Sequence, residues 1–272
     1  MKEAHLVTVG TSILSNASRR GLVGAECRDA IERLLRGEEV KLSKECRDEI
    51  YQALVSSPYQ LSAELNAMKG FLEGEAVVDI VRLYATDTPA GRLAAELLQR
   101  YLADRGVRVV EVETIPNLGK NFWEGIINLV KRVASDVKKL KATHLVYLNP
   151  TGGFKPETAA AIMAASMAGA HAVYYIHEYM RTPVSLPILP VKPDTELMKS
   201  YINTLKEIIR RQCREGGIAR IPLDMVGSMA SVLHAAAAAG PVEVEHGVAR
   251  IDCKHLIHLK GYLDALMEAA TE

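Results

Sequence analysis

A paired-glycine turn holds the residue types most able to do chemistry in this chain. The segment 148–156, LNPTGGFKP, lies between an apolar strand at 143–147 and an alanine-rich helical segment that begins at Glu157. Backbone N–H groups, the positive end of a helix and the Lys155 ammonium would converge there, and all three favour an anion. The turn therefore predicts an anion site, although a tight turn with a solvated lysine explains this segment alone equally well.

Two familiar phosphate-binding motifs do not fit this turn. A Walker A loop needs glycine where Leu148 stands and an unbroken Gly-Lys pair, which Phe154 separates here. A dinucleotide fingerprint needs a third glycine at a set spacing, and Lys155 and Pro156 stand in its place. The predicted anion site is thus of another kind.

The elements around the turn alternate between strands and helices, which predicts an α/β, Rossmann-like fold with a mostly parallel six-stranded sheet. Prolines at 183, 187, 190 and 193 indicate that the sixth strand is an edge strand or an exit segment. The predicted strands are 4–9, 77–84, 107–115, 143–149, 172–176 and 184–191. The predicted helices of this domain are 17–36, 43–71, 89–105, 121–139 and 157–169.

The pattern changes after residue 193. Helices at 195–214 and 222–239 precede a hairpin at 242–251 and a last helix at 255–269. This order predicts a small winged-helix-like domain. The domains are therefore expected at 1–192 and 193–272.

Ligands of open parallel sheets bind beyond the carboxyl ends of the strands. The loops expected there are rich in hydroxyl and amide groups, with Lys120 and Lys155 as cations and without a dense carboxylate or histidine cluster. They predict an anionic ligand held without a metal or other cofactor. The residues assigned to the ligand are Gly10, Thr11, Ser12, Asn16, Asp87, Asn149, Thr151, Gly152, Gly153, Phe154 and Lys155.

Some of these loop residues have competing structural roles. Thr88 before Pro89 is typical of a helix N-cap, and Asn121 predicts a second cap. Asp87 is expected to support the Thr88 turn. Ser12 has the alternative role of a turn hydroxyl that caps the helix after it.

Composition excludes several classes of protein. The 33 basic and 33 acidic residues balance, so no overall field attracts nucleic acid or a membrane. No signal peptide or membrane-spanning run is found, and a cytoplasmic protein is expected. The four cysteines form no Cys-x-x-Cys pair, which argues against zinc. Buried free thiols are expected, with disulfides as the alternative for a hyperthermophile.

Three segments together resemble the CARF domain, the CRISPR-associated Rossmann fold. They are Val9-Gly10-Thr11-Ser12 after the first strand, 149–155 after the fourth and the proline-rich 182–187. The resemblance covers about residues 1–192. It implies a homodimer that binds cyclic oligoadenylates, the second messengers of type III CRISPR defence. With its winged-helix-like tail the chain is similar to the stand-alone ring nucleases, which cleave cyclic tetra-adenylate without a metal.

The resemblance also implies roles for individual residues. Ser12 matches the hydroxyl that positions the attacking ribose 2′-OH or the scissile phosphate. Lys155 and the amides of Gly152 and Gly153 would stabilise the developing phosphorane. A twofold dimer would present these groups twice to the symmetric ring. The sequence offers no general base for this step.

Further residues are predicted to contact the ligand, and each has an alternative structural role. Arg19 and Arg20 would reach phosphates or adenines, or form a solvated helix face. Trp123 would stack on a base, or pack in the core. The histidines at 144, 171 and 177 are expected to be satisfied core or edge residues.

Other functions remain open from the sequence. A CARF domain that senses the ring without cutting it fits the same residues. A transcription regulator fits less well, because residues 194–272 carry nine Lys and Arg against eleven Asp and Glu, and Glu243 and Glu245 lie on the predicted wing. A HEPN ribonuclease would use Arg250 and His255, but Arg250 is predicted in a hairpin. A metabolic nucleotide enzyme lacks any supporting motif.

Overall fold

The computed structural model describes residues 2–75, 77–176, 182–188, 193–238 and 242–271. The chain divides into two compact units, Met1–Val191 and Lys192–Glu272. The predicted domain boundary after residue 192 falls at a position outside the described residues. None of the helices within the described ranges has the length and apolar character needed to cross a membrane.

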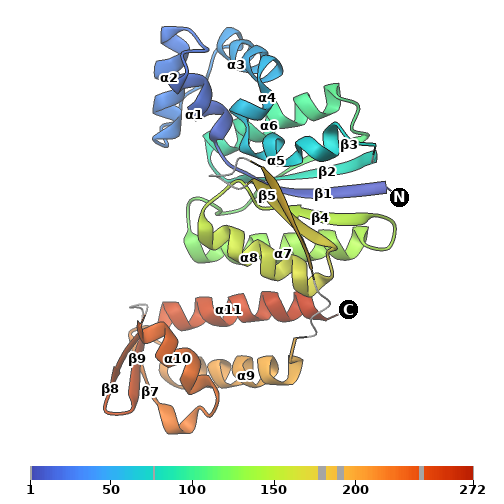
Figure 1. The fold of residues 1–272 in the computed structure, drawn as a ribbon. Helices are drawn as coiled ribbons and strands as arrows, with labels where there is room; N and C mark the ends of the chain where they lie inside the picture. The colour runs from blue at the N-terminus through green and yellow to red at the C-terminus, as the bar shows by residue number, and fades with distance from the viewer. Residues whose placement is uncertain (1, 76, 177–181, 189–192, 239–241, 272) are drawn as a thin grey trace. The chain divides into compact units, whose positions relative to one another are not determined.

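A six-stranded sheet forms the centre of the first unit (Figure 1). The strands are parallel except the edge strand β6, which pairs antiparallel with β5, as the prolines predict. β1 is an inner strand, and every residue of it after Lys2 is buried, as expected of a parallel strand covered on both faces. The strand order is β3-β2-β1-β4-β5-β6, with β1 Lys2–Val9, β2 Val77–Thr86, β3 Val109–Ile115, β4 Leu145–Asn149, β5 Ala172–Ile176 and β6 Pro183–Pro187.

The register of the sheet brings the loops of interest to one edge. Val9 lies opposite Ala85 of β2, and Val7 lies opposite Asn149 of β4. The turns that follow these strands therefore emerge side by side. The predicted fold class, a mostly parallel Rossmann-like sheet, is confirmed.

Helices cover both faces of this sheet (Figure 1). Helices α7 and α8 pack against one another on one face, and the earlier helices lie on the other. The helices of this unit are α1 Ser12–Arg19, α2 Ala25–Leu35, α3 Lys44–Ser56, α4 Pro58–Leu61, α5 Ala63–Leu72, α6 Pro89–Asp104, α7 Phe122–Leu140 and α8 Lys155–Ala168.

The sequence predicted two long helices, at 17–36 and 43–71, and this prediction is wrong because each segment is divided among shorter helices. The segment 17–36 is interrupted at Gly21, whose φ of 63° ends α1. The segment 43–71 is interrupted at Pro58 and again at Ser62. The Ser62 hydroxyl accepts from the Leu65 N–H at 3.0 Å and starts α5 as an N-cap.

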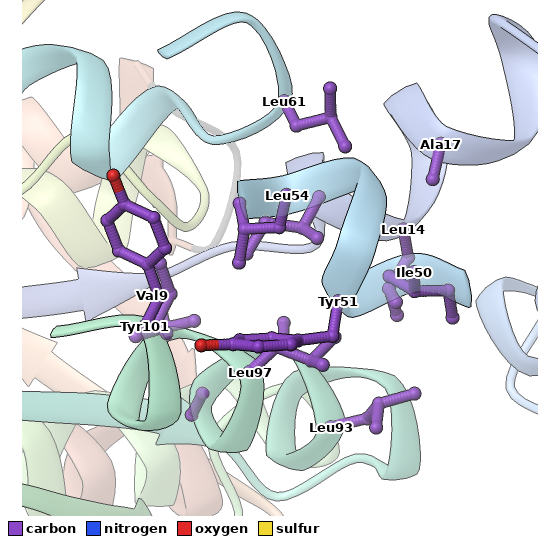
Figure 2. Packing of buried hydrophobic residues seen from close by; sticks show 14 of the residues in the cluster. Val9, Leu14, Ala17, Ile50, Tyr51, Leu54, Leu61, Leu93, Leu97 and Tyr101 are labelled. Carbon is purple, nitrogen blue, oxygen red and sulfur yellow. The ribbon is translucent and has the colours of Figure 1, made fainter. Parts of the chain in front are cut away.

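One hydrophobic core of the first unit lies between the sheet and the α1–α6 layer. Figure 2 shows Leu54, Leu61 and Tyr51 of that layer gathered with Val9 of β1. Leu54 and Leu61 are fully buried. Each such leucine contributes about 1.5–3 kcal/mol of hydrophobic stabilisation. This packing holds the short helices α1–α5 against the sheet.

All four cysteines form disulfides, so the expectation of free thiols is wrong. Cys27 of α2 pairs with Cys46 of α3, with Cα atoms 5.2 Å apart. Cys213 pairs with Cys253 across 40 residues. Spacing alone does not reveal such pairs, since the fold brings the Cα atoms together. The argument for a reducing cytosol, which rested on free thiols, no longer holds.

The second unit combines helices with a three-stranded antiparallel sheet of order β7-β9-β8. The hairpin is confirmed, but the helix predicted from residue 222 is wrong at its start. Residues 218–222 alternate between exposed and buried and form strand β7, which pairs with β9. The elements are α9 Thr195–Gln212, β7 Ile218–Pro222, a 3-10 turn Leu223–Met225, α10 Met229–Ala238, β8 Val242–Glu245, β9 Val248–Asp252 and α11 Cys253–Ala270.

Candidate functional site at the carboxyl ends of the strands

A cavity of about 500 Å³ opens where β1, β2 and β4 end. Most of the predicted site residues meet there, although the sequence separates them by about 140 positions. The structure therefore juxtaposes the two turns as the parallel topology predicts. The predicted residues that line the cavity are Gly10, Thr11, Ser12, Thr151, Gly152, Gly153 and Phe154.

Gly152 locks the two turns together. A Cβ atom at this position would lie 2.3 Å from the Gly10 nitrogen and 2.4 Å from the Thr8 carbonyl oxygen. The Thr8 hydroxyl also donates a hydrogen bond to the Gly152 carbonyl at 2.5 Å. Only glycine allows this approach of backbone to backbone.

The groups that favour an anion are left available at the second turn. Gly153 adopts a φ of 98°, which glycine tolerates. In the described parts of the chain, the N–H groups of Gly152 and Gly153 have no acceptor. Lys155 does not line the cavity. It is exposed at the first position of α8, next to the lining residue Phe154, and forms no ion pair with a described residue. Backbone donors, a helix N-terminus and a cation thus remain open to an anion.

Asn149 has a structural role in this turn. It is fully buried, and its amide donates to the Glu64 carbonyl at 3.1 Å. Its side-chain oxygen accepts from the N–H and the hydroxyl of Thr151, at 3.2 and 2.5 Å. Asn149 does not line the cavity. It holds the turn that does.

Glu64, at the start of α5, is a cavity residue that the sequence analysis did not find. It is 1% exposed, and its carboxylate accepts hydrogen bonds from the Gly10 N–H at 2.8 Å, the Ser12 hydroxyl at 3.2 Å and the Ser62 hydroxyl at 2.7 Å. The prediction of one helix over 43–71 placed Glu64 in a helix interior. The Ser62 cap, three residues before an apolar position, is the signal that would have indicated a helix start.

Ser12 does not cap the helix that follows it. It is the first residue of α1, whose N-cap Thr11 makes no side-chain cap hydrogen bond. The Ser12 hydroxyl instead donates to Glu64 and accepts from the Ala63 N–H at 3.2 Å. Ser12 thus connects α1 to α5 at the cavity wall.

Glu157 is a second carboxylate of the cavity that the sequence analysis missed. It is buried, and its carboxylate accepts from the Phe154 N–H at 2.9 Å. Burial raises the pKa of Glu157, against the opposing effect of that hydrogen bond. The sequence analysis named Glu157 only as the start of an alanine-rich helical segment.

Arg36 supplies a cation at the cavity, whereas the sequence analysis named Lys120 and Lys155 as the cations of the site. It follows the last residue of α2, and it hydrogen bonds to Glu38 at 3.3 Å. Arg19 and Arg20, for which phosphate or adenine contacts and a solvated helix face were the two alternatives, are exposed and do not line the cavity. The break at Gly21 places the end of α2 at the site instead.

Asp87, Asn16 and Lys120 do not line the cavity either. Asp87 pairs with Lys120 at 3.1 Å and with Arg92 at 2.9 Å. The Lys120 ammonium, with help from Arg92, holds the pKa of Asp87 below its usual value. The Asn16 amide donates to the Leu61 carbonyl at 2.9 Å. For each of these residues the structure shows a local partner.

The expected helix caps are confirmed. The Thr88 hydroxyl accepts from the Gly91 N–H at 3.1 Å, and Pro89 occupies the first helical position of α6. The Asn121 side chain accepts from the Glu124 N–H at 3.3 Å. These caps fix where α6 and α7 begin.

The expected roles of two histidines are also confirmed. His144 pairs with Asp79 at 2.9 Å. His171 accepts from the Val146 N–H at 3.0 Å, while His177 lies outside the described residues.

The ring of Trp123 packs edge-on against Phe122 at a centroid distance of 5.3 Å, away from the cavity lining.

The two residues that match the HEPN ribonuclease motif lie in a strand and in a helix. Arg250 lies in β9 and pairs with Glu243 at 3.6 Å, and His255 lies in α11. The second unit contains a three-stranded sheet and therefore differs from an all-helical domain.

Comparison with protein families gives one finding. Residues 59–189 match the model of the CRISPR-associated protein family Cas_APE2256. The match covers just under half of the chain and extends from α4 to the end of β6, so it contains Glu64 and the paired-glycine turn. It supports a CRISPR-associated protein.

Proposed function

We propose that the first unit binds cyclic tetra-adenylate and cleaves it, as a ring nuclease that ends type III CRISPR signalling. The observation that carries this proposal is the shared cavity of Ser12 and the Gly152–Gly153 turn. Lys155 lies next to this turn and forms no ion pair with any described residue. The match to a CRISPR-associated family and the resemblance to CARF domains support it.

The symmetry of the ligand favours a homodimer. Cyclic tetra-adenylate carries four phosphodiesters around a symmetric ring. Two copies of this chain related by a twofold axis would present Ser12 and Lys155 twice, at opposite sides of the ring. A dimer of this kind would make two cuts and release two linear di-adenylates.

The proposed reaction is a transesterification within the ring. A ribose 2′-oxygen attacks the adjacent phosphorus, and the bond from phosphorus to the 5′-oxygen breaks. The product end is a 2′,3′-cyclic phosphate, and the departing 5′-oxygen takes a proton. Alignment of the attacking and leaving oxygens supplies much of the rate.

The second turn suits the phosphate of this reaction. The N–H groups of Gly152 and Gly153, which have no acceptor among the described residues, and the Lys155 ammonium would stabilise charge on the phosphorane oxygens. The reaction as proposed uses no metal and no cofactor.

Product analysis tests this proposal. The protein is incubated with cyclic tetra-adenylate in EDTA, and the expected product is di-adenylate with a 2′,3′-cyclic phosphate. Ser12→Ala should lower the rate about 100-fold, whereas Lys131→Ala, on the exposed side of α7, should not. Tight binding of an intact ring would instead indicate a sensor or a ligand-controlled regulator. Loss of cleavage in EDTA would refute the metal-independent mechanism.

A further inference from the structure

The Glu64 carboxylate lies behind the first turn of the cavity. It is buried and accepts three hydrogen bonds, from Gly10, Ser12 and Ser62. Such a set of donors compensates the burial of a negative charge. A carboxylate next to an anion site is unusual on electrostatic grounds, so its contacts call for a functional explanation.

These contacts fix the direction of the Ser12 hydroxyl. A carboxylate only accepts hydrogen bonds, so the single hydroxyl hydrogen of Ser12 points to Glu64. One lone pair of Ser12 Oγ accepts from the Ala63 N–H. The remaining lone pair is available to a ligand, because Ser12 is half-buried and lines the cavity. Ser12 therefore meets the ligand as an acceptor.

The same carboxylate separates the roles of the two turns. It occupies the Gly10 N–H, which removes a donor that would otherwise attract a phosphate oxygen. The unoccupied N–H groups lie on the other turn, at Gly152 and Gly153. The first turn is thus suited to the attacking hydroxyl, and the second to the phosphate.

We infer that Glu64 is a positioning residue that makes Ser12 the acceptor for the attacking 2′-OH, an inference that rests on the proposed function. The 2′-OH proton passes to Ser12 Oγ as the Ser12 proton passes to Glu64. The bond from the 2′-oxygen to phosphorus then forms, and the bond from phosphorus to the 5′-oxygen breaks. Because Glu64 is buried, its proton returns through Ser12 Oγ and is carried by water to the departing 5′-oxygen. Glu64 supplies the base that no neighbour of Ser12 in the sequence provides.

Glu64→Gln tests this assignment. The glutamine amide donates to Ser12, so the hydroxyl hydrogen turns to the cavity and Ser12 no longer accepts from the 2′-OH. We expect single-turnover cleavage of cyclic tetra-adenylate to fall about 100-fold. Affinity for the intact ring should stay within about 3-fold, since Lys155 and the second turn are unchanged.

The double variant separates positioning from general support of the fold. If Glu64 acts through Ser12, then Glu64→Gln with Ser12→Ala should be no slower than Ser12→Ala alone, within about 3-fold. Ser43→Ala, which removes the cap of α3 that accepts from the Cys46 N–H at 3.1 Å, controls for a lost helix-start contact and should keep full cleavage.

Three outcomes would overturn the inference. One is cleavage by Glu64→Gln at the wild-type rate, which leaves the proposed function intact. A second is a double variant in which the loss of cleavage rate equals the product of the losses in the two single variants. The third is a wild-type protein that does not cut the ring, because the proposed function then fails and this inference with it. Should Glu64→Gln not fold, Glu64→Asp applies the same test, with at least about a 10-fold loss expected as the carboxylate withdraws from Ser12.

Discussion

The two ends of the parallel sheet use charge in opposite ways. At the amino end, the buried Asp79 accepts two hydrogen bonds from Arg108 at 2.6 Å and one from His144 at 2.9 Å, with Lys2 at 3.7 Å. At the carboxyl end, the described residues leave Lys155 without an ion pair. The Asp79 cluster is internally satisfied, whereas Lys155 is open to a partner.

This difference separates stability from function within one domain. Charged groups that pair with one another, as Asp79 and Arg108 do, have little hydrogen-bonding capacity left for a ligand. Groups that remain unpaired, as at Gly152, Gly153 and Lys155, are retained at a cost in stability. Changes at the amino end should therefore lower stability, and changes at the carboxyl end should lower ligand binding and cleavage.

The largest effect is expected at Gly152, where structure and function coincide. Gly152→Ala places a Cβ atom within 2.4 Å of two backbone atoms, so the two turns must separate. We expect about 3 kcal/mol loss of unfolding free energy together with loss of cleavage. Guanidinium unfolding and the product assay measure the two effects.

Gly70→Ala is the matched control for that substitution. Gly70 lies within α5, and no atom lies within 4 Å of an added Cβ. This variant should gain about 0.5–1 kcal/mol, because alanine favours the helix. A Gly152→Ala variant as stable and active as Gly70→Ala would contradict the locked-turn geometry.

Asp79→Asn tests the amino end. It removes the charge-assisted hydrogen bonds of Arg108 and His144 and should cost about 2 kcal/mol of unfolding free energy at pH 7. Cleavage by the folded variant should be unchanged.

The ion pair of Asp79 with Arg108 makes the unfolding free energy depend on pH. Arg108 and then His144 lower the pKa of Asp79. This contribution is fully present above the unfolded carboxyl pKa of about 3.9 and is lost as the pH falls below it. The stability difference between wild type and Asp79→Asn should therefore shrink below about pH 4. A difference that is constant down to pH 2 would argue against the ion pair.

Sequence reasoning reached the two turns because they obey a general topological rule. Gly10, Ser12 and Gly152 follow strands whose apolar runs are plain in the sequence, and parallel strands end at one edge. The Thr88 and Asn121 caps also depend only on local residues. Such features are predictable because each needs no knowledge of distant contacts.

The features that were missed depend on tertiary structure. Glu64 joins the site only because α5 starts anew at Ser62 and packs against β1 and β4. The Cys27–Cys46 pair depends on how α2 and α3 meet. Strand β7 is short and finds its partner in β9, about 30 residues later. No local pattern determines these long-range contacts.

The smallest effect is expected at Glu157. Burial raises the pKa of Glu157 above the unfolded value, so folding disfavours its charged form. Stability is then greatest below the unfolded pKa and declines as the pH rises through the folded pKa. Glu157→Gln should gain less than about 1 kcal/mol at pH 7, measured by thermal unfolding. A clear loss would indicate that the Phe154 hydrogen bond outweighs burial.

One measurement compares the two ends directly. Cyclic tetra-adenylate is incubated in EDTA with the wild type, with Lys155→Ala and with Arg108→Ala, each confirmed as folded. We expect di-adenylate with a 2′,3′-cyclic phosphate from the wild type and from Arg108→Ala, and about 100-fold slower cleavage by Lys155→Ala. Equal rates for all three proteins, or a ring that the wild type neither binds nor cuts, would contradict the assignment of function to the carboxyl end of the sheet.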